Sequence, residues 1–182
     1  MSTRGMIAYK RGNFFKGVYH SFDSMPTSLG RDLWNWVKEN GVKKFRKLID
    51  ASPGGFNYFN DGEMDDIIIK IGDFENGFYT CLDDPLFLEW VYVIDGKNLA
   101  IYHHAVVGLR GKPKLRIEKK NNLFFYGHCV AKHFLVGKFS LRGKEPDWQK
   151  IEEIAKEKKR KEEQKLLEKL RKLRRNRKKV GR

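Results

Sequence analysis

The sequence has only two cysteines, Cys81 and Cys129, among its 182 residues. Two thiols cannot form a disulfide framework, so we expect a reduced protein in a cytoplasm, the host cytoplasm if the chain is virus-encoded. No apolar run is long enough to cross a bilayer and no signal-peptide pattern occurs, so we expect no membrane partner. Acidic residues are also scarce, with 23 Asp and Glu against 38 Lys and Arg and a net charge of +15. This imbalance favours phosphate-rich partners, of which nucleic acid is the first candidate.

The positive charge is concentrated near the carboxyl end. Residues 144–182 contain 17 Lys and Arg but 8 Asp and Glu, a net charge of +9, whereas residues 1–143 carry +6. Strong helix formers fill this segment, and no glycine follows Gly143 until Gly181. The composition predicts a helix from about 146 to about 178, with Pro146 and Asp147 in its first turn. We therefore expect two parts, an α+β globular body at 1–143 and an extended basic helix at 144–182.

The apolar residues of this predicted helix form two groups, separated by ten residues without an apolar side chain. The groups are Trp148, Ile151, Ile154 and Ala155, and then Leu166, Leu167, Leu170 and Leu173. We expect the first group to anchor the helix on the body and the intervening residues to stand in solvent. The second group would meet a partner or a groove of the body.

The body contains two hairpin patterns and two helical ones. The runs MIAYK and FFKGVYHSF are joined by Arg11-Gly12-Asn13, and FLEWVYVID and LAIYHH are joined by GKN. TSLGRDLWNWVKENG and VKKFRKLIDA predict helices, the first one ending at Gly41. Further strands are predicted at DIIIKIG, FYTCL, KLRIEK, LFFYG and HCVAKHFLVGKFSL. Short connections favour an antiparallel sheet with the helices on one face, an α+β fold.

One short stretch, YHSFDSMPTSLG at 19–30, combines residue types used in catalysis. His20 could act as a base oriented by Asp23, with Ser21 or Ser24 as the nucleophile. The same residues also suit a turn followed by a helix that Thr27 or Ser28 caps through its side chain. Since turn and capping chemistry accounts for nearly every polar residue in the stretch, we prefer that interpretation and assign no catalytic residue.

The blocks TRGMIAYKR, GVYHSFDSMPTSLG and EWVYVIDGKNLAIY resemble an uncharacterised family of phage, bacterial and some fungal proteins. The matching positions are Arg4, Gly5, Phe22, Asp23, Ser24, Pro26, Leu29, Gly30 and Asp95. Where that family favours Asn-His before the phenylalanine, this chain has His20-Ser21, and Met25 replaces an aromatic residue. The resemblance covers about the first hundred residues in scattered blocks. It implies kinship with phage-like or mobile-element-like proteins and carries no assigned activity.

A hydrolase remains an alternative. Removal of Met1 would leave Ser2 at the start of a strand, as in amino-terminal-nucleophile hydrolases. Nothing in the sequence identifies the oxyanion donors that such chemistry requires.

Metal binding is the other catalytic possibility. His103, His104, His128, Cys129 and His133 are potential ligands, but the chain has no Cys-x-x-Cys pattern. We expect these residues to be core or edge residues, and we expect no metal and no cofactor.

Two basic sets are candidate nucleic-acid contacts. One lies in the body, near aromatic residues that could stack on bases, and the other lies in the carboxyl-terminal segment. They comprise Arg110, Lys112, Lys114 and Arg116, and Lys165, Lys169, Arg171, Lys172, Arg174, Arg175, Arg177, Lys178 and Lys179. We expect a module that binds RNA or a ribonucleoprotein, with DNA as a further candidate. The alternatives are a hydrolytic body and a small inhibitor of a host nucleic-acid machine.

Overall fold

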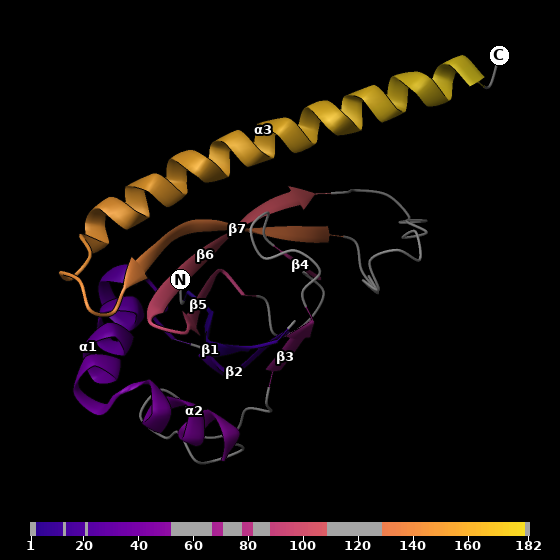
Figure 1. Cartoon of the computed structure of the whole chain (residues 1–182). Coiled ribbons are helices and arrows are strands. Elements are labelled where there is room, and N and C mark those ends of the chain that lie inside the picture. Colours follow the sequence, from indigo (N-terminus) through magenta and orange to yellow (C-terminus); the bar gives the residue numbers. More distant parts are fainter. Residues whose placement is uncertain are drawn as a thin grey trace.

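A computed structural model describes residues 3–12, 14–20, 22–51, 67–70, 78–81, 88–108 and 129–180 of the chain (Figure 1). The strands are β1 (Gly5–Arg11), β2 (Phe14–His20), β3 (Ile67–Lys70), β4 (Phe78–Cys81), β5 (Trp90–Asp95), β6 (Asn98–Gly108) and β7 (Cys129–Ser140). The helices are α1 (Arg31–Asn40), α2 (Val42–Asp50) and α3 (Trp148–Val180), and a single π-helical turn, η1 (Pro26–Gly30), leads into α1. The fold class is α+β. The predicted strands KLRIEK and LFFYG lie outside the described residues.

The seven strands form one sheet in the order β3-β2-β1-β5-β6-β7-β4. Both predicted hairpins are confirmed, because β1 pairs antiparallel with β2 and β5 pairs antiparallel with β6. The expectation of a purely antiparallel sheet is wrong, since β1 and β5 are parallel neighbours in the middle of the sheet. The β1–β2 hairpin leaves the other edge of β1 free, and β5 occupies that edge after the chain has passed through α1 and α2. Such a long connection permits parallel pairing, which a two-residue turn does not.

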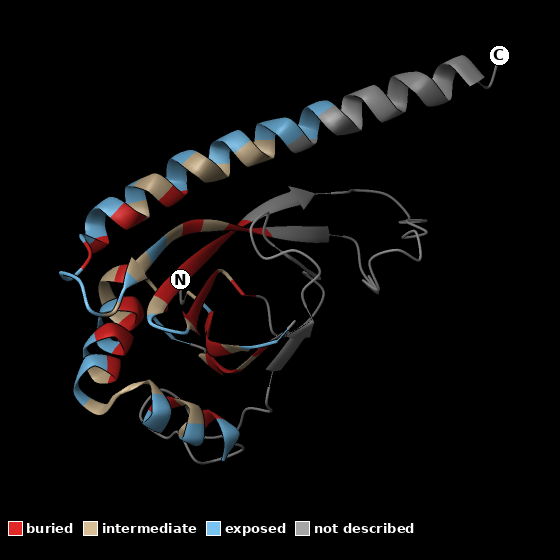
Figure 2. Cartoon of the chain, in the orientation of Figure 1, coloured by how far each residue is buried: buried red, intermediate tan, exposed pale blue. Residues whose placement is uncertain are grey.

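The helices cover one face of the sheet, as expected. Alternate residues of the central strands, such as Ile7, Tyr92 and Ile101, join a core cluster with residues of all three α-helices. The other alternate residues, including Met6 and Val91, form a second buried cluster on the opposite face. Figure 2 shows buried positions along the inner sides of α1, α2 and the start of α3. Successive side chains of a strand point to opposite faces of the sheet, and in the central strands both sets are apolar. Both faces of the sheet are therefore covered with apolar side chains.

Gly41 separates α1 from α2, as the sequence predicts. Its φ of 81° places it in the region that favours glycine, and its N–H donates to the Val37 carbonyl 2.8 Å away. The chain therefore turns at Gly41, and Phe45 and Ile49 of α2 enter the same core as Leu33 of α1.

The last helix begins at Trp148, slightly later than predicted. Asp147 is outside the helix and caps it, since its Oδ1 accepts the Lys150 N–H at 3.0 Å. The anchoring role of the first apolar group is confirmed, because Trp148, Ile151 and Ala155 are buried in the core. In Figure 1 the helix then runs past β6 and β7, and its carboxyl-terminal part extends away from the strands.

Candidate functional site

The turn between β2 and η1 contains the residues considered for catalysis. Ser24 is completely buried, and its Oγ lies 3.1 Å from Nδ1 of His20. The Ser24 N–H donates to Oγ1 of Thr3 at 2.8 Å, and the Tyr92 hydroxyl donates to the Ser24 carbonyl at 2.7 Å. Ser24 therefore fixes the turn to β1 and β5, and its hydroxyl has no exposed surface for a substrate to reach.

Asp23 does not orient His20. Its Oδ2 accepts a hydrogen bond from the Ser28 hydroxyl at 2.8 Å. Its φ of +33° is the only positive value at a non-glycine among the described residues, and an aspartate tolerates it because its side chain bonds locally. The described hydrogen bonds of Asp23 and Ser24 therefore stabilise the turn, and the one described for the Asp23 carboxylate comes from Ser28. Ser2 and Ser21, the other proposed nucleophiles, lie outside the described residues.

The expected side-chain cap by Thr27 or Ser28 is wrong. Neither η1 nor α1 has a side-chain capping bond from its own N-terminal residue. Instead Oε1 of Glu152, on α3, accepts both the Thr27 N–H at 3.2 Å and the Thr27 hydroxyl at 2.8 Å. A carboxylate near a helix N-terminus is favourable for the orphan N–H groups and for the helix dipole. The cap is therefore supplied from 125 residues away.

Three histidines form a buried cluster where β6 and β7 pass beneath α3. His103 and His104 each direct Nδ1 to the Glu89 carbonyl, at 2.9 and 3.2 Å, and Nε2 of His133 bonds the Leu88 carbonyl at 2.8 Å. We call these three residues the histidine cluster. They satisfy carbonyl groups of the segment that leads into β5.

Each member of the histidine cluster is held neutral. Burial, and then the neighbouring charges, lower the pKa of His103 to about 3 and that of His104 to about 4. Burial also lowers the pKa of His133 to about 3. Within the described part of the chain, no group of three or more His, Cys, Asp or Glu side chains is arranged to hold a metal ion. The histidine cluster is thus buried, neutral and hydrogen-bonded to backbone carbonyls.

Two lysines of α3 bond to the sheet. Lys159 Nζ lies 3.3 Å from Nε2 of His104. Lys158 Nζ donates to the carbonyls of Leu135 and Val136, at 3.1 and 2.9 Å. These carbonyls lie where the β6–β7 register shifts between Ile101 and Tyr102, and such a bulge disrupts the regular ladder. The expectation that residues 156–165 stand in solvent is therefore wrong at both lysines, because their ammonium groups fasten the helix.

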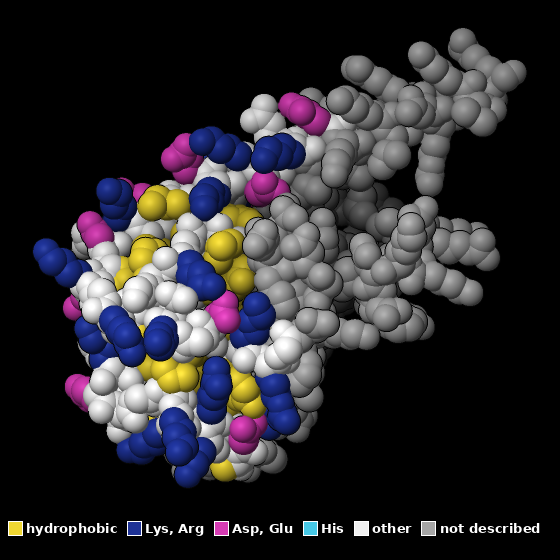
Figure 3. All heavy atoms as spheres, in the orientation of Figure 1, with side chains coloured by type: hydrophobic (Ala, Val, Ile, Leu, Met, Phe, Trp, Pro, Cys, Tyr) yellow, Lys and Arg dark blue, Asp and Glu magenta, His cyan; other side chains and the backbone are white. Residues whose placement is uncertain are grey.

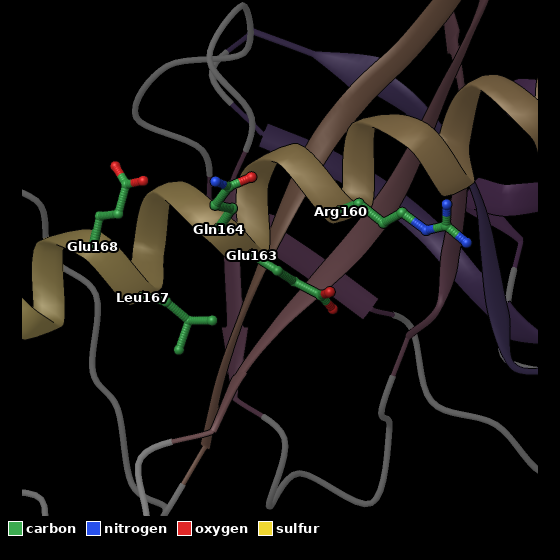
Figure 4. Close-up of a pocket in the computed structure, with 5 residues that line it drawn as sticks. All are labelled: Arg160, Glu163, Gln164, Leu167 and Glu168. Carbon is green, nitrogen blue, oxygen red and sulfur yellow. The ribbon is translucent and has the colours of Figure 1, made fainter.

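The surface of α3 just beyond these contacts has a shallow pocket. Its lining residues are Arg160, Glu163, Gln164, Leu167 and Glu168, all on α3 (Figure 4). In Figure 4, Glu163 and Leu167 extend to one side of the helix, and Gln164 and Glu168 to the other. Leu167 is 51% exposed, and with Phe22 it is one of the two large apolar side chains that are exposed among the described residues. The apolar group that the sequence placed here is therefore accessible at Leu167.

The structure describes few side chains of the predicted nucleic-acid set. Lys165 is exposed on α3 and pairs with Glu162, Nζ to Oε1 at 3.1 Å. Arg110, Lys112, Lys114 and Arg116 lie outside the described residues. From Lys169 to Lys179 the backbone belongs to α3, and the side chains lie outside the description. We call residues 169–182 the basic segment. As far as Val180 it continues α3, whose first turns are packed into the core.

Sequence reasoning missed three contributors to this arrangement: Glu152, Lys158 and Lys159. In the sequence, Glu152 has the spacing of an ion pair with Lys156, four residues further along the helix. The adjacent Lys158 and Lys159 looked like ordinary solvated charge. The available signal was their position, since both follow the buried Ala155 by about one turn and so lie near the helix face that meets the sheet.

These features define an α+β protein with a mixed sheet and a helix, α3, whose first part packs against the body and caps η1. Comparison with protein-family models, with curated proteins and with solved structures found no match. Among the described residues, no helix combines the length and the hydrophobicity needed to cross a bilayer.

Proposed function

We propose that the protein binds nucleic acid through the basic segment of α3, with RNA or a ribonucleoprotein as the first partner and DNA as the second. The observation that carries the proposal is the attachment of α3. Trp148, Ile151 and Ala155 are buried, and Lys158 and Lys159 bond to the sheet and the histidine cluster. The helix is therefore held at one end, while the positive charge lies at the other.

The length of α3 beyond its buried first turns would allow the basic segment to contact a surface separate from the body. Lys169 follows the buried Ala155 by fourteen positions, which corresponds to about 21 Å along a helix at 1.5 Å per residue. Figure 1 shows the carboxyl-terminal part of α3 lying apart from the strands. A groove or a phosphate backbone could approach that part from several directions without contacting the core.

The distribution of charge also favours the carboxyl-terminal end of α3 as the nucleic-acid contact. The basic segment has nine Lys and Arg and no Asp or Glu. Figure 3 shows basic side chains spread over the described part of one face of the body, with acidic side chains among them. Phosphates would relieve the mutual repulsion within the basic segment, and binding would release cations condensed on the nucleic acid. A surface of mixed charge would gain less.

Binding of a labelled RNA hairpin and of a DNA duplex of equal length would test the proposal across a range of salt concentrations. Replacing Arg171, Arg174, Arg175 and Lys178 with glutamine keeps good helix formers but removes four charges. We expect the slope of log affinity against log salt to fall by about 3 to 4, since each phosphate contact contributes roughly 0.7 to 0.9. Deleting residues 166–182 should abolish most of the binding.

The matched control replaces four basic residues of the body with glutamine: Arg31, Lys43, Lys44 and Lys47, all exposed on α1 and α2. This variant should retain the affinity and most of the salt slope. Retention of RNA by the truncated chain, or an equal loss in the control, would refute the proposal. Tighter binding of the DNA duplex than of the hairpin would reverse the order of partners.

A further inference from the structure

The charge of α3 changes abruptly at Lys169. Residues 148–168 contain seven Lys and Arg and six Asp and Glu, a net charge of +1. Several of these lysines are occupied within the protein: Lys161 and Lys165 pair with glutamates one helical turn earlier, at 2.5 and 3.1 Å, and Lys158 donates to carbonyls of β7. From Lys169 to Val180 the helix has eight Lys and Arg and no acid. The contact with nucleic acid therefore has a defined start on the helix.

The basic positions beyond this boundary surround the helix axis. The backbone of α3 is helical as far as Val180, so each residue is rotated by about 100° from the one before it. On such a helix, the eight basic positions leave no sector of the circumference wider than about 80° without one. A helix that lies along a single phosphate backbone needs positive charge on one side only. The distribution therefore indicates a partner that presents phosphates on more than one side of the helix.

Two acidic side chains mark where such a partner would end. Glu163 and Glu168 line the shallow pocket just before the basic segment, and in Figure 4 they extend to opposite sides of α3. Phosphates on either side of this turn would be repelled. The acid-free part of the helix, from Lys169 to Val180, has twelve residues and is about 18 Å long. This length suits insertion into a groove, whereas a partner that followed the whole of α3 would meet both acids.

The depth of the groove distinguishes RNA from DNA. An α-helix with its side chains is about 10 to 12 Å in diameter, and the B-DNA major groove is about 8.5 Å deep, so the outer side of a helix in that groove faces away from both strands. The RNA major groove is deeper, but in a regular A-form duplex it is too narrow for side chains to enter. Unpaired nucleotides interrupt the stack of base pairs and let the two strands separate locally. A groove opened in this way would enclose the helix between phosphates.

We propose that residues 169–180 of α3 insert into the major groove of an RNA duplex where a bulge or an internal loop widens that groove. This inference rests on the proposed function and adds to it the class of RNA, the groove and the limit of the contact. Glu163 and Glu168 would lie at the mouth of the groove. The body would remain outside the duplex, because the buried Ala155 precedes Lys169 by about 21 Å along the helix.

Three ligands of equal length would test the class of nucleic acid with the full-length protein: an RNA hairpin with a three-nucleotide bulge, the same hairpin fully paired, and a DNA duplex. We expect the bulged hairpin to bind more tightly than the paired one by about tenfold or more, since the regular groove excludes the helix. Dimethyl sulfate methylates N7 of guanine in the major groove, and bound protein should protect the guanines beside the bulge. Equal affinities for the two hairpins, or tighter binding of the DNA, would overturn the proposal.

Arg175 and Arg177 test whether the helix is enclosed, because their positions lie about 160° apart around the axis. Arg175→Gln and Arg177→Gln should each weaken binding to the bulged hairpin by about fivefold at 0.1 M salt, the contribution of one phosphate contact. A helix that lay on one phosphate backbone would lose affinity in only one of the two variants. That result would contradict insertion into a groove.

Glu168→Gln tests the limit of the contact. It removes repulsion at the mouth of the groove and should strengthen binding severalfold. The matched control, Glu153→Gln, removes an exposed acid about 22 Å further back along α3 and should leave the affinity within about twofold of the wild type, since that distance exceeds the screening length. Equal effects of the two substitutions would show that the contact has no boundary at Glu168.

The two proposals can fail separately. If the chain lacking residues 166–182 binds every ligand as the full-length protein does, the proposed function fails and this inference fails with it. Binding that requires residues 166–182 but does not distinguish the bulged hairpin from the paired one would retain the proposed function and refute the widened groove.

Discussion

The side chain of Lys159 and the ring of His104 join α3 to β6 through a contact of 3.3 Å between Nζ and Nε2. Nδ1 of His104 faces the Glu89 carbonyl and must carry the ring hydrogen, so Nε2 has the lone pair that accepts from lysine. The contact therefore requires neutral His104. Burial, aided by the charge of Lys159, lowers the pKa of His104 to about 4 and so maintains that state at neutral pH.

Acid should destabilise the protein in a window set by the histidine cluster. In the unfolded chain these histidines take up protons near their ordinary pKa of 6.5, but in the folded chain they do so only near 3 to 4. Because the unfolded state binds more protons in that interval, the free energy of unfolding falls as the pH decreases below about 6.5. Each histidine contributes up to about 1.4 kcal/mol per pH unit.

Urea unfolding at pH 7, 6 and 5 would measure this dependence, above the range in which most carboxylates titrate. His104→Gln, which removes one titrating group, should reduce the slope by about one proton. A free energy of unfolding that stays constant from pH 7 to 5 would contradict the neutral state of the histidine cluster.

Glu152 should matter more to stability than its neighbour on α3. Glu152→Ala removes the acceptor of the Thr27 N–H and hydroxyl, and we expect a loss of about 1 to 2 kcal/mol, as for a helix cap. Glu153→Ala removes an exposed carboxylate one position away and should change stability by less than about 0.5 kcal/mol. Chemical unfolding of both variants would measure the difference, and equal losses would argue against the cap.

Lys158 should stabilise the bulge in β7. Lys158→Met keeps most of the aliphatic stem but removes the ammonium that bonds the Leu135 and Val136 carbonyls, and we expect a loss of about 1 to 2 kcal/mol. Lys156→Met is the exposed control and should be nearly neutral. Amide hydrogen exchange would localise the effect. Increased exchange near Val136 in the first variant alone is expected, whereas identical profiles would show that the lysine contributes nothing there.

Gly5 should tolerate no side chain while Ser24 is in place. A Cβ at Gly5 would lie 2.6 Å from Cβ and 2.7 Å from Oγ of Ser24, so Gly5→Ala should cost about 1 to 3 kcal/mol through overpacking. Ser24→Gly removes both contacting atoms, and the double variant should recover part of the loss from Gly5→Ala. Additive losses in a double-mutant cycle would show that the two positions do not interact.

Local pattern was sufficient to predict most elements of the fold. Both hairpins, α1, α2 and the Gly41 break follow from two-residue turns, apolar periodicity and a glycine position, which are properties of short segments. The parallel pairing of β1 with β5 did not follow, because it depends on which strand reaches the free edge of β1 after a long connection. Nothing in the sequence pattern of β1 or β5 predicts that the two strands are neighbours.

The candidate sites were less predictable than the fold. The stretch at 19–30 forms a turn, as the sequence predicts, but its helix cap was assigned to Thr27 or Ser28, when Glu152 supplies it. Lys158 and Lys159, which bond α3 to the sheet, cannot be distinguished in the sequence from the solvated lysines beside them. Their role depends on which side of the helix meets the sheet, and on the bulge that exposes carbonyls at Leu135 and Val136.

The sequence by itself determined the periodicities that form the strands and helices, and the concentration of positive charge near the carboxyl end, because both are properties of consecutive residues. The tertiary structure alone decided which polar groups meet across long separations: Glu152 with Thr27, Lys159 with His104, and the Tyr92 hydroxyl with the Ser24 carbonyl. Burial gives the histidines their chemistry, since it keeps them neutral. Burial arises only when distant segments pack together.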